Sequence, residues 1–581
     1  MNNSRTINTP RSADLVTFTI LIEGVELSAV YQVKNISVEK EINRIPFAQL
    51  VFFDGEAASQ NFELSNEDLL IPGKEIEIKA GYHNENETIF KGIIIKHSIK
   101  IRENNSVLIV ECRDQAVKMT IGRKSNYYYE STDSDIIEEI ISKYNLQSDV
   151  AATSFANKEI VQYRTSDWDF IMTRAQFNGQ ICLVDDGKIT IAKPDLSQDE
   201  IETVAFGATL LDFDAEMDAR NQFNTITAFG WNPSEQEIVE APAANPNFSL
   251  NGNISVSELA DVMDLENLEL KHGGSYNSAQ LQQWSDSKNL FQQLSKTRGR
   301  IKFQGIANAK PGTMIKLEGV GDRFNGKVFI NAVRHEIVDG NWTVDAEFGI
   351  NPKWFSETYD ISELPASGII PAVSGLQVGV VSQLEADPDG EDRILVKIPI
   401  INQDEQGIWT RIATLDAGEN RGSFFRPEIG DEVIVGFIND DPNHAVILGM
   451  LHSSAKPAPI TASDENNEKG FVTRSEMKLL FNDEKKSVTI ETPGGKKVII
   501  DEDAGVIKIE DDNNNIITMD DNGIALESGN EFNIKATGDC NIEAMNINVK
   551  ANAQFKAEGS AGAEVSTSAI AVIKGSLVQI N

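Results

Sequence analysis

Cysteine, histidine and basic residues are all scarce in this 581-residue chain. Its three cysteines, Cys112, Cys182 and Cys540, lie far apart and show neither a disulfide framework nor metal-ligand spacing. This usage is typical of a protein that folds in a reducing cytoplasm. Basic residues number 52 against 89 acidic residues, which gives a formal net charge of −37. Because so acidic a surface repels phosphate backbones and anionic lipid headgroups, we expect no nucleic-acid partner.

Long apolar runs are absent as well. No stretch of about 18 apolar residues occurs, so we expect no membrane-spanning helix. The first residues, MNNSRTINTPRSADLVTFTILIEG, lack the apolar core of a signal peptide and alternate as in a strand. We therefore expect assembly in the cytoplasm without a signal peptide, and delivery by a route other than general secretion.

Alternating apolar residues predict a mainly β protein with a few helices. Strands are expected from Val16 onward, whereas a period of 3.6 predicts three helices. These are Thr132–Tyr144, capped by Asp133 or Ser134, then Ser166–Asn178, and finally Ser278–Lys296. The Pro- and Asn-containing stretch Glu237–Leu250 is expected to be a loop, and Asp339-Gly340-Asn341 a hairpin turn.

Two polar, proline-containing connections divide the sequence. Leu364–Ser374 and Lys456–Lys469 flank a β segment of about 80 residues that ends near Leu451. The predicted domains are therefore residues 1–365, 373–455 and 471–581, with a linker at 456–470.

The last of these domains contains a short internal repeat. Apolar residues occur in pairs, two positions apart, and the pairs begin roughly every 8 to 10 residues, closer to 8 in the second half. The clean pairs are Val488/Ile490, Val498/Ile500, Ile507/Ile509, Ile517/Met519, Ile524/Leu526, Phe532/Ile534, Cys540/Ile542 and Ile547/Val549. The series continues less regularly to Val578/Ile580. Such repetition indicates a solenoid or array.

The repeat favours a needle built from three chains. A strand with only two inward apolar side chains cannot bury them alone. About 8 residues between strands suffice for one face of a prism, whereas one turn of a single-chain β-helix needs about 20. Three chains that each supply one face per layer would close the prism and remove its sheet edges. A single-chain solenoid and a disordered tail are the alternatives.

Several motifs suggest chemistry, but in incomplete form. Gly321–Val328 (GDRFNGKV) resembles a phosphate-binding loop, yet valine replaces the hydroxyl residue and a strand follows. His335-Glu336 begins a zinc-protease motif whose second histidine is replaced by Asp339. Asp387–Asp392 and Asp511–Asn515 lack EF-hand spacing, and Cys540 fits a buried hydrophobe better than a metal ligand. We expect no catalytic residue, no metal and no cofactor.

The middle segment resembles a known family. Gly379–Pro399 and Trp409–Leu451, with the motif RG-x-x-F-x-PEIGDEV-x-VGF-x-x-x-DP followed by ILG, resemble the oligonucleotide/oligosaccharide-binding (OB) fold domain of VgrG spike proteins. The stretch VQYRTSDWDFIMTRAQFNG within Val161–Pro194 is similar to the hub of that family, and the ending KGSLVQIN is similar to its tip. The likeness covers most of the chain and is weakest before Val161.

The resemblance implies a homotrimeric central spike of a contractile injection system. It implies a tube-like β-barrel hub with a few helices, a small OB-fold barrel and a C-terminal trimeric intertwined β-helix needle. Expected partners are an inner tube protein, baseplate proteins and a PAAR-type cap, with effectors as a further candidate. We expect the cap to bind Leu577, Val578, Gln579, Ile580 and Asn581.

Such spikes assemble in the bacterial cytoplasm and pierce a target membrane mechanically. The machine could be a phage-tail-like particle, a type VI secretion system or a phage baseplate. Only about 20 residues separate Leu451 from Phe471, too few for an inserted lysozyme domain, and we expect a spike without an enzyme. A peptidoglycan-hydrolysing spike and a glycan-binding adhesin that uses the small barrel are the alternatives from other functional classes.

Overall fold

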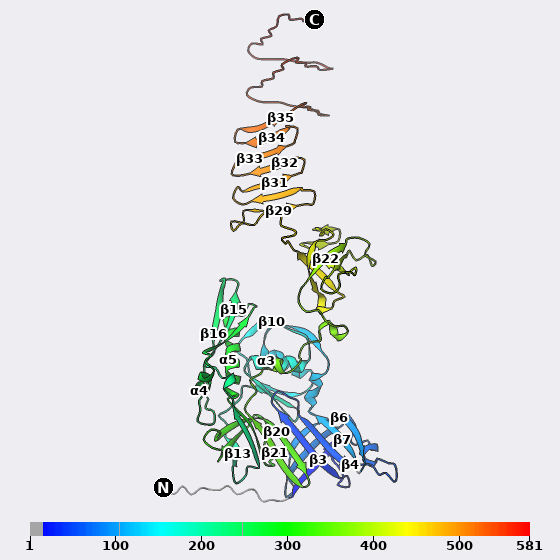
Figure 1. Ribbon diagram of the computed structural model, residues 1–581, viewed down its shortest axis with the longest axis vertical. Coiled ribbons are helices and arrows are strands. Elements are labelled where there is room, and N and C mark those ends of the chain that lie inside the picture. Colours follow the sequence, from blue (N-terminus) through cyan, green and yellow to red (C-terminus); the bar gives the residue numbers. More distant parts are fainter. Residues whose placement is uncertain (1–14, 104, 247, 581) are drawn as a thin grey trace. The chain divides into compact units, whose positions relative to one another are not determined.

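The chain is mainly β, as predicted. The computed structural model describes residues 15–103, 105–246 and 248–580. They form two compact units (Figure 1). The first comprises the described residues up to Ser374 together with Asn439–Pro442, and the second comprises Gly375–Ile438 and the described residues from Asn443. The predicted domain boundaries stay predictions.

A thirteen-stranded sheet dominates the first unit (Figure 1). One half contains β1 (Val16–Ile22), β2 (Val25–Glu26), β3 (Val33–Glu41), β4 (Phe47–Phe53), β5 (Glu75–Tyr82), β6 (Glu85–Arg102) and β7 (Asn105–Arg113). The other half contains β13 (Glu200–Ala205), β14 (Asp212–Met217), β18 (Thr297–Gln304), β19 (Met314–Glu318), β20 (Gly326–Val338) and β21 (Asn341–Phe348). Antiparallel pairing of β3 with β20 makes the two halves one continuous sheet.

Each half of this sheet has its own hydrophobic core. Alternation in β3 and β4 points Ile36, Val38 and Leu50 into the first core, where all three are fully buried. Ile301 and Val344 are equally buried in the second core. The long strands β6 and β20 carry register shifts, which allow a strand to bend around a core.

The three predicted helices are confirmed as α2 (Asp133–Ser142), α3 (Asp167–Phe177) and α5 (Ser278–Leu294). The predicted cap of the first helix is wrong. Thr132, not Asp133 or Ser134, accepts a hydrogen bond from the backbone N–H of Asp135 and completes a capping box with that residue. Asp133 instead turns inward and forms a buried ion pair with Arg174 of α3, at 2.8 Å.

Smaller sheets and short helices surround the predicted helices. Two strands pair as β8 (Lys124–Thr132) and β10 (Ala156–Thr165), and three form β9 (Gln147–Val150), β11 (Ile181–Asp185) and β12 (Lys188–Ala192). A third sheet contains β15 (Thr225–Asn232), β16 (Glu237–Pro242) and β17 (Asn267–His272), against which α5 packs. Short helices are α1 (Glu63–Asn66), α4 (Val256–Ala260) and α6 (Phe355–Thr358).

The predicted loop at Glu237–Leu250 is wrong in its first part, which is strand β16. Its pairing with β15 sets Ala241 opposite Ala228, and both are buried beneath Leu281 of α5. This non-local packing outweighs the proline at position 242. By contrast, the predicted turn at Asp339-Gly340 is confirmed, because both residues have the positive φ that a tight hairpin requires.

The second unit begins with a small closed barrel. Its strands are β22 (Gln377–Gln383), β23 (Ile394–Lys397), β24 (Ile408–Ile412), β27 (Glu432–Phe437) and β28 (Ala445–Met450), closed in the order β22-β23-β24-β28-β27. Val381, Val396, Val433 and Ile447 fill its interior. This five-stranded closed barrel confirms the predicted small barrel.

Seven five-residue strands follow as a ladder (Figure 1). They are β29 (Glu468–Val472), β30 (Lys478–Asn482), β31 (Ser487–Glu491), β32 (Lys497–Asp501), β33 (Val506–Glu510), β34 (Ile516–Asp520) and β35 (Gly523–Glu527). Each pairs antiparallel with the next strand of the same chain. This part therefore differs from the intertwined arrangement expected for the whole needle. The described residues after Glu527 contain no strand.

No helix among the described residues is long and apolar enough to cross a membrane.

Candidate assembly face and tip

Polar turns reverse the chain between the strands of the ladder. Between β31 and β32, Gly495 has a φ of 82° and the N–H of Thr492 donates to the carbonyl of Lys496. Between β33 and β34, the N–H of Asp511 donates to the carbonyl of Asn515. Five-residue strands joined by such turns repeat about every 10 residues, which matches the first half of the sequence repeat.

The antiparallel register gathers the apolar pairs on one side of the ladder. Ile490 lies opposite Val498, Val498 opposite Ile509, and Ile509 opposite Ile517. We call the resulting two columns the apolar face. One column contains Phe471, Leu479, Ile490, Val498, Ile509, Ile517 and Leu526, and the other contains Phe481, Val488, Ile500, Ile507, Met519 and Ile524. Cross-strand neighbours of this kind stabilise a sheet.

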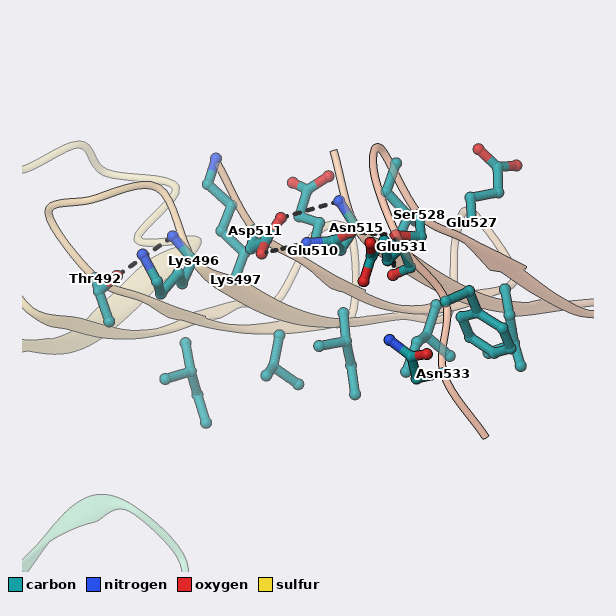
Figure 2. Close-up of a pocket in the computed structure, with 17 residues that line it drawn as sticks. Thr492, Lys496, Lys497, Glu510, Asp511, Asn515, Glu527, Ser528, Glu531 and Asn533 are labelled. Atoms are coloured by element: carbon teal, nitrogen blue, oxygen red, sulfur yellow. Dashed lines mark hydrogen bonds between the residues drawn. The ribbon is translucent and has the colours of Figure 1, made fainter. Parts of the chain in front are cut away.

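Within the single chain the apolar face is largely open to solvent. Nine of its thirteen side chains are exposed, from 40% for Met519 to 71% for Ile524. A groove of about 640 Å³ follows the first column and is also lined by Phe532. In Figure 2 the labelled Lys496, Asp511 and Asn515 lie on one side of the ribbon, while hydrocarbon side chains project from the other. The groove therefore offers a long apolar surface with polar groups along its rim.

The polar groups along the rim form hydrogen bonds and ion pairs with one another. The carboxylate of Asp511 accepts hydrogen bonds from the N–H groups of Asn513 and Asn515, each at 2.9 Å, and from the Asn515 side-chain amide. Hydrogen bonding by Asn515, first through its side chain and then through its backbone, lowers the pKa of Asp511 to about 2. Lys496 also pairs with Asp512 at 3.1 Å. In the part of the chain that the structure describes, no His, Cys, Asp and Glu side chains form a group suited to a metal ion.

The predicted tip lies beyond the ladder. Leu577, Val578, Gln579 and Ile580 are exposed and outside any strand, and Asn581 lies outside the described residues. Cys540, expected to be buried at an inward position of the repeat, is exposed in the single chain. The assignment of these residues to the binding of a cap therefore stays a prediction.

The two partial motifs of the first unit lie in ordinary β structure. Gly321, with a φ of 84°, starts a turn, and Val328 is buried on β20 where the phosphate-binding motif would need a helix. His335 is buried on β20 with its Nε2 atom 3.2 Å from the carbonyl oxygen of Ala309. Burial, then the positive charge of Lys40, lower the pKa of His335 to about 3, so it is neutral at physiological pH.

The small barrel contacts the start of the ladder. Phe425 stacks on Phe471, with ring centroids 5.2 Å apart and ring planes 10° from parallel. Arg474 pairs with Glu428 at 2.8 Å. Sequence reasoning did not identify these contacts, although Phe425 belongs to the RG-x-x-F motif that carried the family resemblance.

Family models match both units of the chain. The model of the Alg8 N-terminal domain matches residues 12–339, and the model described as type VI secretion system/phage-baseplate injector OB domain matches residues 377–452. The second match coincides with the closed barrel.

Curated relatives include spike proteins of type VI secretion systems. The type VI secretion system spike protein VgrG1a of Pseudomonas aeruginosa is 23% identical over 207 residues, which cover 32% of this chain and 31% of that protein. The spike protein VgrG3 of Vibrio cholerae is 27% identical over 141 residues, covering 22% of this chain and 13% of that protein. The chain thus spans a third or less of the length of these two relatives.

Solved structures align with parts of this chain. A tail protein from Neisseria meningitidis covers 59% of this chain and 98% of its own, with a TM-score of 0.44 and 13% identity. An Escherichia coli protein described as a component of the type VI secretion system covers 74% of this chain and 99% of its own, with a TM-score of 0.37 and 13% identity. These likenesses concern the fold alone.

Proposed function

Because this chain belongs to the VgrG-type spike family, with residues 12–339 belonging to the Alg8 N-terminal domain family, we propose that it is the homotrimeric central spike of a contractile injection system. In this proposal the first unit is the hub that joins the inner tube and baseplate proteins. The small barrel is a collar, and the ladder and the residues after it form the needle. Sheath contraction drives the needle through a target membrane.

The exposed apolar face of the ladder is the observation that carries this proposal. Nine of the thirteen apolar side chains on one side of the seven-stranded sheet are exposed in the single chain. Half-burying each of them contributes about 1 kcal/mol, or roughly 10 kcal/mol per chain. That gain is of the size needed to offset the cost of association.

Three copies suit this face better than two. A single partner sheet would cover only part of the two-column apolar face. Three sheets arranged around one axis would instead close a prism and cover both columns of each face. The apolar pairs after Glu527 continue the same alternation, from Phe532/Ile534 to Val578/Ile580, and are exposed in the single chain. Their backbone groups would pair with the other two copies, as buried backbone groups require.

The same reasoning, that exposed apolar side chains require a partner, applies to the C-terminal end of the needle. Leu577, Val578 and Ile580 are apolar and exposed, and the backbone around them is outside any strand. A PAAR-type cap that covers these side chains and the backbone groups beside them would shield an end that is otherwise prone to aggregate. Effectors would travel as separate proteins, bound to the spike or the cap.

A matched pair of charge substitutions on β34 tests the trimer. Ile517 lies on the apolar face, and its neighbour Thr518 points to the opposite side of the same strand. Ile517→Asp should shift the full-length protein from a trimer to monomers in light scattering coupled to gel filtration. Thr518→Asp, with the same added charge, should remain trimeric. A monomeric wild-type protein, or an Ile517→Asp trimer as resistant to dissociation as the wild type, would contradict the proposal.

A further inference from the structure

The small barrel carries a short arm that its own fold does not need. The arm is the hairpin from Thr414 to Phe425, built on strands β25 (Ala417–Gly418) and β26 (Arg421–Gly422). It joins β24 to β27 and lies outside the closed barrel order. Neither its strands nor its exposed side chains belong to the barrel's hydrophobic core.

Hydrogen bonds hold the arm in one conformation. The hydroxyl of Thr414 donates to the carbonyl of Ser423 at 2.6 Å, and the N–H of Ser423 donates to the carbonyl of Asp416 at 2.9 Å. Gly422 has a φ of 136°, and a Cβ atom there would lie 2.4 Å from the Asp416 carbonyl oxygen. The chain therefore folds tightly at Gly422, and glycine is required. A surface fixed in this way loses little entropy when it binds.

One charge of the arm, that of Asp416, is neutralised within it, whereas Glu419 at the turn adds a negative charge. Both carboxylate oxygens of Asp416 accept hydrogen bonds from the same guanidinium nitrogen of Arg421, at 2.6 and 2.9 Å. This pair leaves little net charge beside the apolar end of the arm. In a chain with a net charge of −37, this local ion pair lowers the repulsion between copies at the end of the arm away from Glu419.

Two large apolar side chains project from this rigid arm into solvent. Leu415 is 92% exposed and Phe424 is 84% exposed. The register of the hairpin pairs Ala417 with Gly422, and its extension by two residues beyond the strands would set Leu415 opposite Phe424. Side chains at such opposite positions are neighbours and form one patch.

The patch adjoins the apolar face of the needle. Phe425, the next residue after Phe424, stacks on Phe471 of the same chain. Phe471 heads the first column of the apolar face, opposite Leu479, which in turn lies opposite Ile490. Phe425 therefore contacts its own ladder, whereas the preceding Phe424 is exposed to solvent beside that contact.

We propose that the arm is a clamp between subunits, in which Leu415 and Phe424 dock on a second copy of this chain at the root of its needle. This inference rests on the proposed homotrimer and adds a contact outside the needle. Each arm would bind the neighbouring copy in the same direction, so that three arms close a ring around the first layers of the needle. The clamp would hold the collar and the needle in register under axial load.

Site-specific photo-crosslinking of the full-length protein tests the clamp. The photoreactive residue p-benzoylphenylalanine replaces Phe424, whose ring it resembles. The control places it at Asp404, an exposed position in the loop between β23 and β24 of the same barrel. After irradiation of the trimer, boiled samples should show covalent dimers and trimers on denaturing gels for position 424, and single chains for position 404.

A second measurement follows the stability of the trimer. Phe424→Ser should shorten the half-time of trimer dissociation in warm detergent about tenfold, since one large apolar side chain per interface loses its cover. Asp404→Ser should leave the half-time unchanged. Both variants keep the needle intact, so they should still be trimers in light scattering.

The outcomes separate this inference from the proposed function. Intact trimers with no product between chains at position 424, and an unchanged half-time for Phe424→Ser, would overturn the clamp and leave the trimeric spike standing. A product formed only with another protein, such as a baseplate component, would also overturn it. A monomeric wild-type protein would remove the proposed trimer itself.

Discussion

Replacement of Lys40 by methionine should destabilise the first unit, because this lysine is buried at the junction of the two halves of the sheet. Lys40 on β3 is 2% exposed, and its Nζ atom contacts Asp185 and lies 3.1 Å from Asp186. Lys310 reaches the other carboxylate oxygen of Asp185, at 2.6 Å. Both aspartates lie at the tip of the β11–β12 hairpin, so the ion pairs tie that hairpin to the main sheet.

The contacts of Lys40 determine how much stability its replacement should remove. Removal of one partner from a fully buried ion pair costs about 3–5 kcal/mol. Asp185 is 40% exposed and keeps Lys310, which reduces that figure. We therefore expect Lys40→Met to lower the free energy of unfolding by about 2–3 kcal/mol, equivalent to a fall in Tm of about 3–4 °C for a unit of this size.

The loss should also depend on pH. Burial alone would raise the pKa of Asp185, but the charges of Lys40 and Lys310 and their hydrogen bonds outweigh it, and the pKa is lowered. A carboxyl group with a lowered folded-state pKa stabilises the protein above its unfolded-state pKa of about 4, and this contribution is lost as pH falls through the folded value. The difference between wild type and Lys40→Met should therefore be largest at neutral pH and shrink below about pH 4.

Tryptophan fluorescence during guanidinium unfolding is a suitable assay, because five of the six tryptophans precede residue 374. Lys100→Met, at an exposed position of β6, is the matched control and should unfold like the wild type. A Lys40→Met protein within about 0.5 kcal/mol of the wild type at pH 7, or one whose deficit is the same at pH 3, would refute the reasoning.

Three further predictions concern packing, assembly and the tip. Gly305→Ala should lower the free energy of unfolding by about 1–3 kcal/mol, because a Cβ atom at this position would lie 2.1 Å from the ring of Trp342. The near-ultraviolet circular dichroism of Trp342 should change as well. Gly273→Ala, where a Cβ atom meets no other atom within 4 Å, is the control and should leave both unchanged. Cys540 should react with a thiol reagent in denatured chains and be protected in the trimer; fast labelling of the intact trimer would argue against a needle of three chains at that depth. Deletion of Val572–Asn581 should abolish pull-down of a PAAR-type cap while light scattering still shows a trimer, and an unchanged pull-down would exclude the tip assignment.

Local patterns predicted those elements whose stabilising contacts lie close in sequence. The helices α2, α3 and α5 follow from their apolar period and caps, and the Asp339-Gly340 turn follows from its residue types. Local reasoning was wrong for strand β16, whose stability comes from pairing with β15 and cover by α5. The short helix α4 went unpredicted although Ser255 and Glu258 form a capping box, a signal present in the sequence.

The candidate site was predictable in part for the same reason. The apolar pairs identified which side chains share a face, but not the arm of the small barrel. The exposure of Leu415 and Phe424 depends on where the barrel leaves them, and the stack of Phe425 on Phe471 joins residues far apart in the sequence. Residues 414–425 have no periodicity that would have singled them out.

By itself, the sequence determined that the last part of the chain is an array of short strands with one apolar side, because side chains alternate along any extended backbone. Only the tertiary structure decided which strands pair. Where the repeat is about 10 residues long, the turns leave room for reversal, and each strand bonds to the next strand of its own chain. Where the repeat shortens to about 8, the described residues form no ladder within the chain. The geometry between segments that lie apart in the sequence determines which strands exchange hydrogen bonds. The alternation of side chains along one strand does not contain that information.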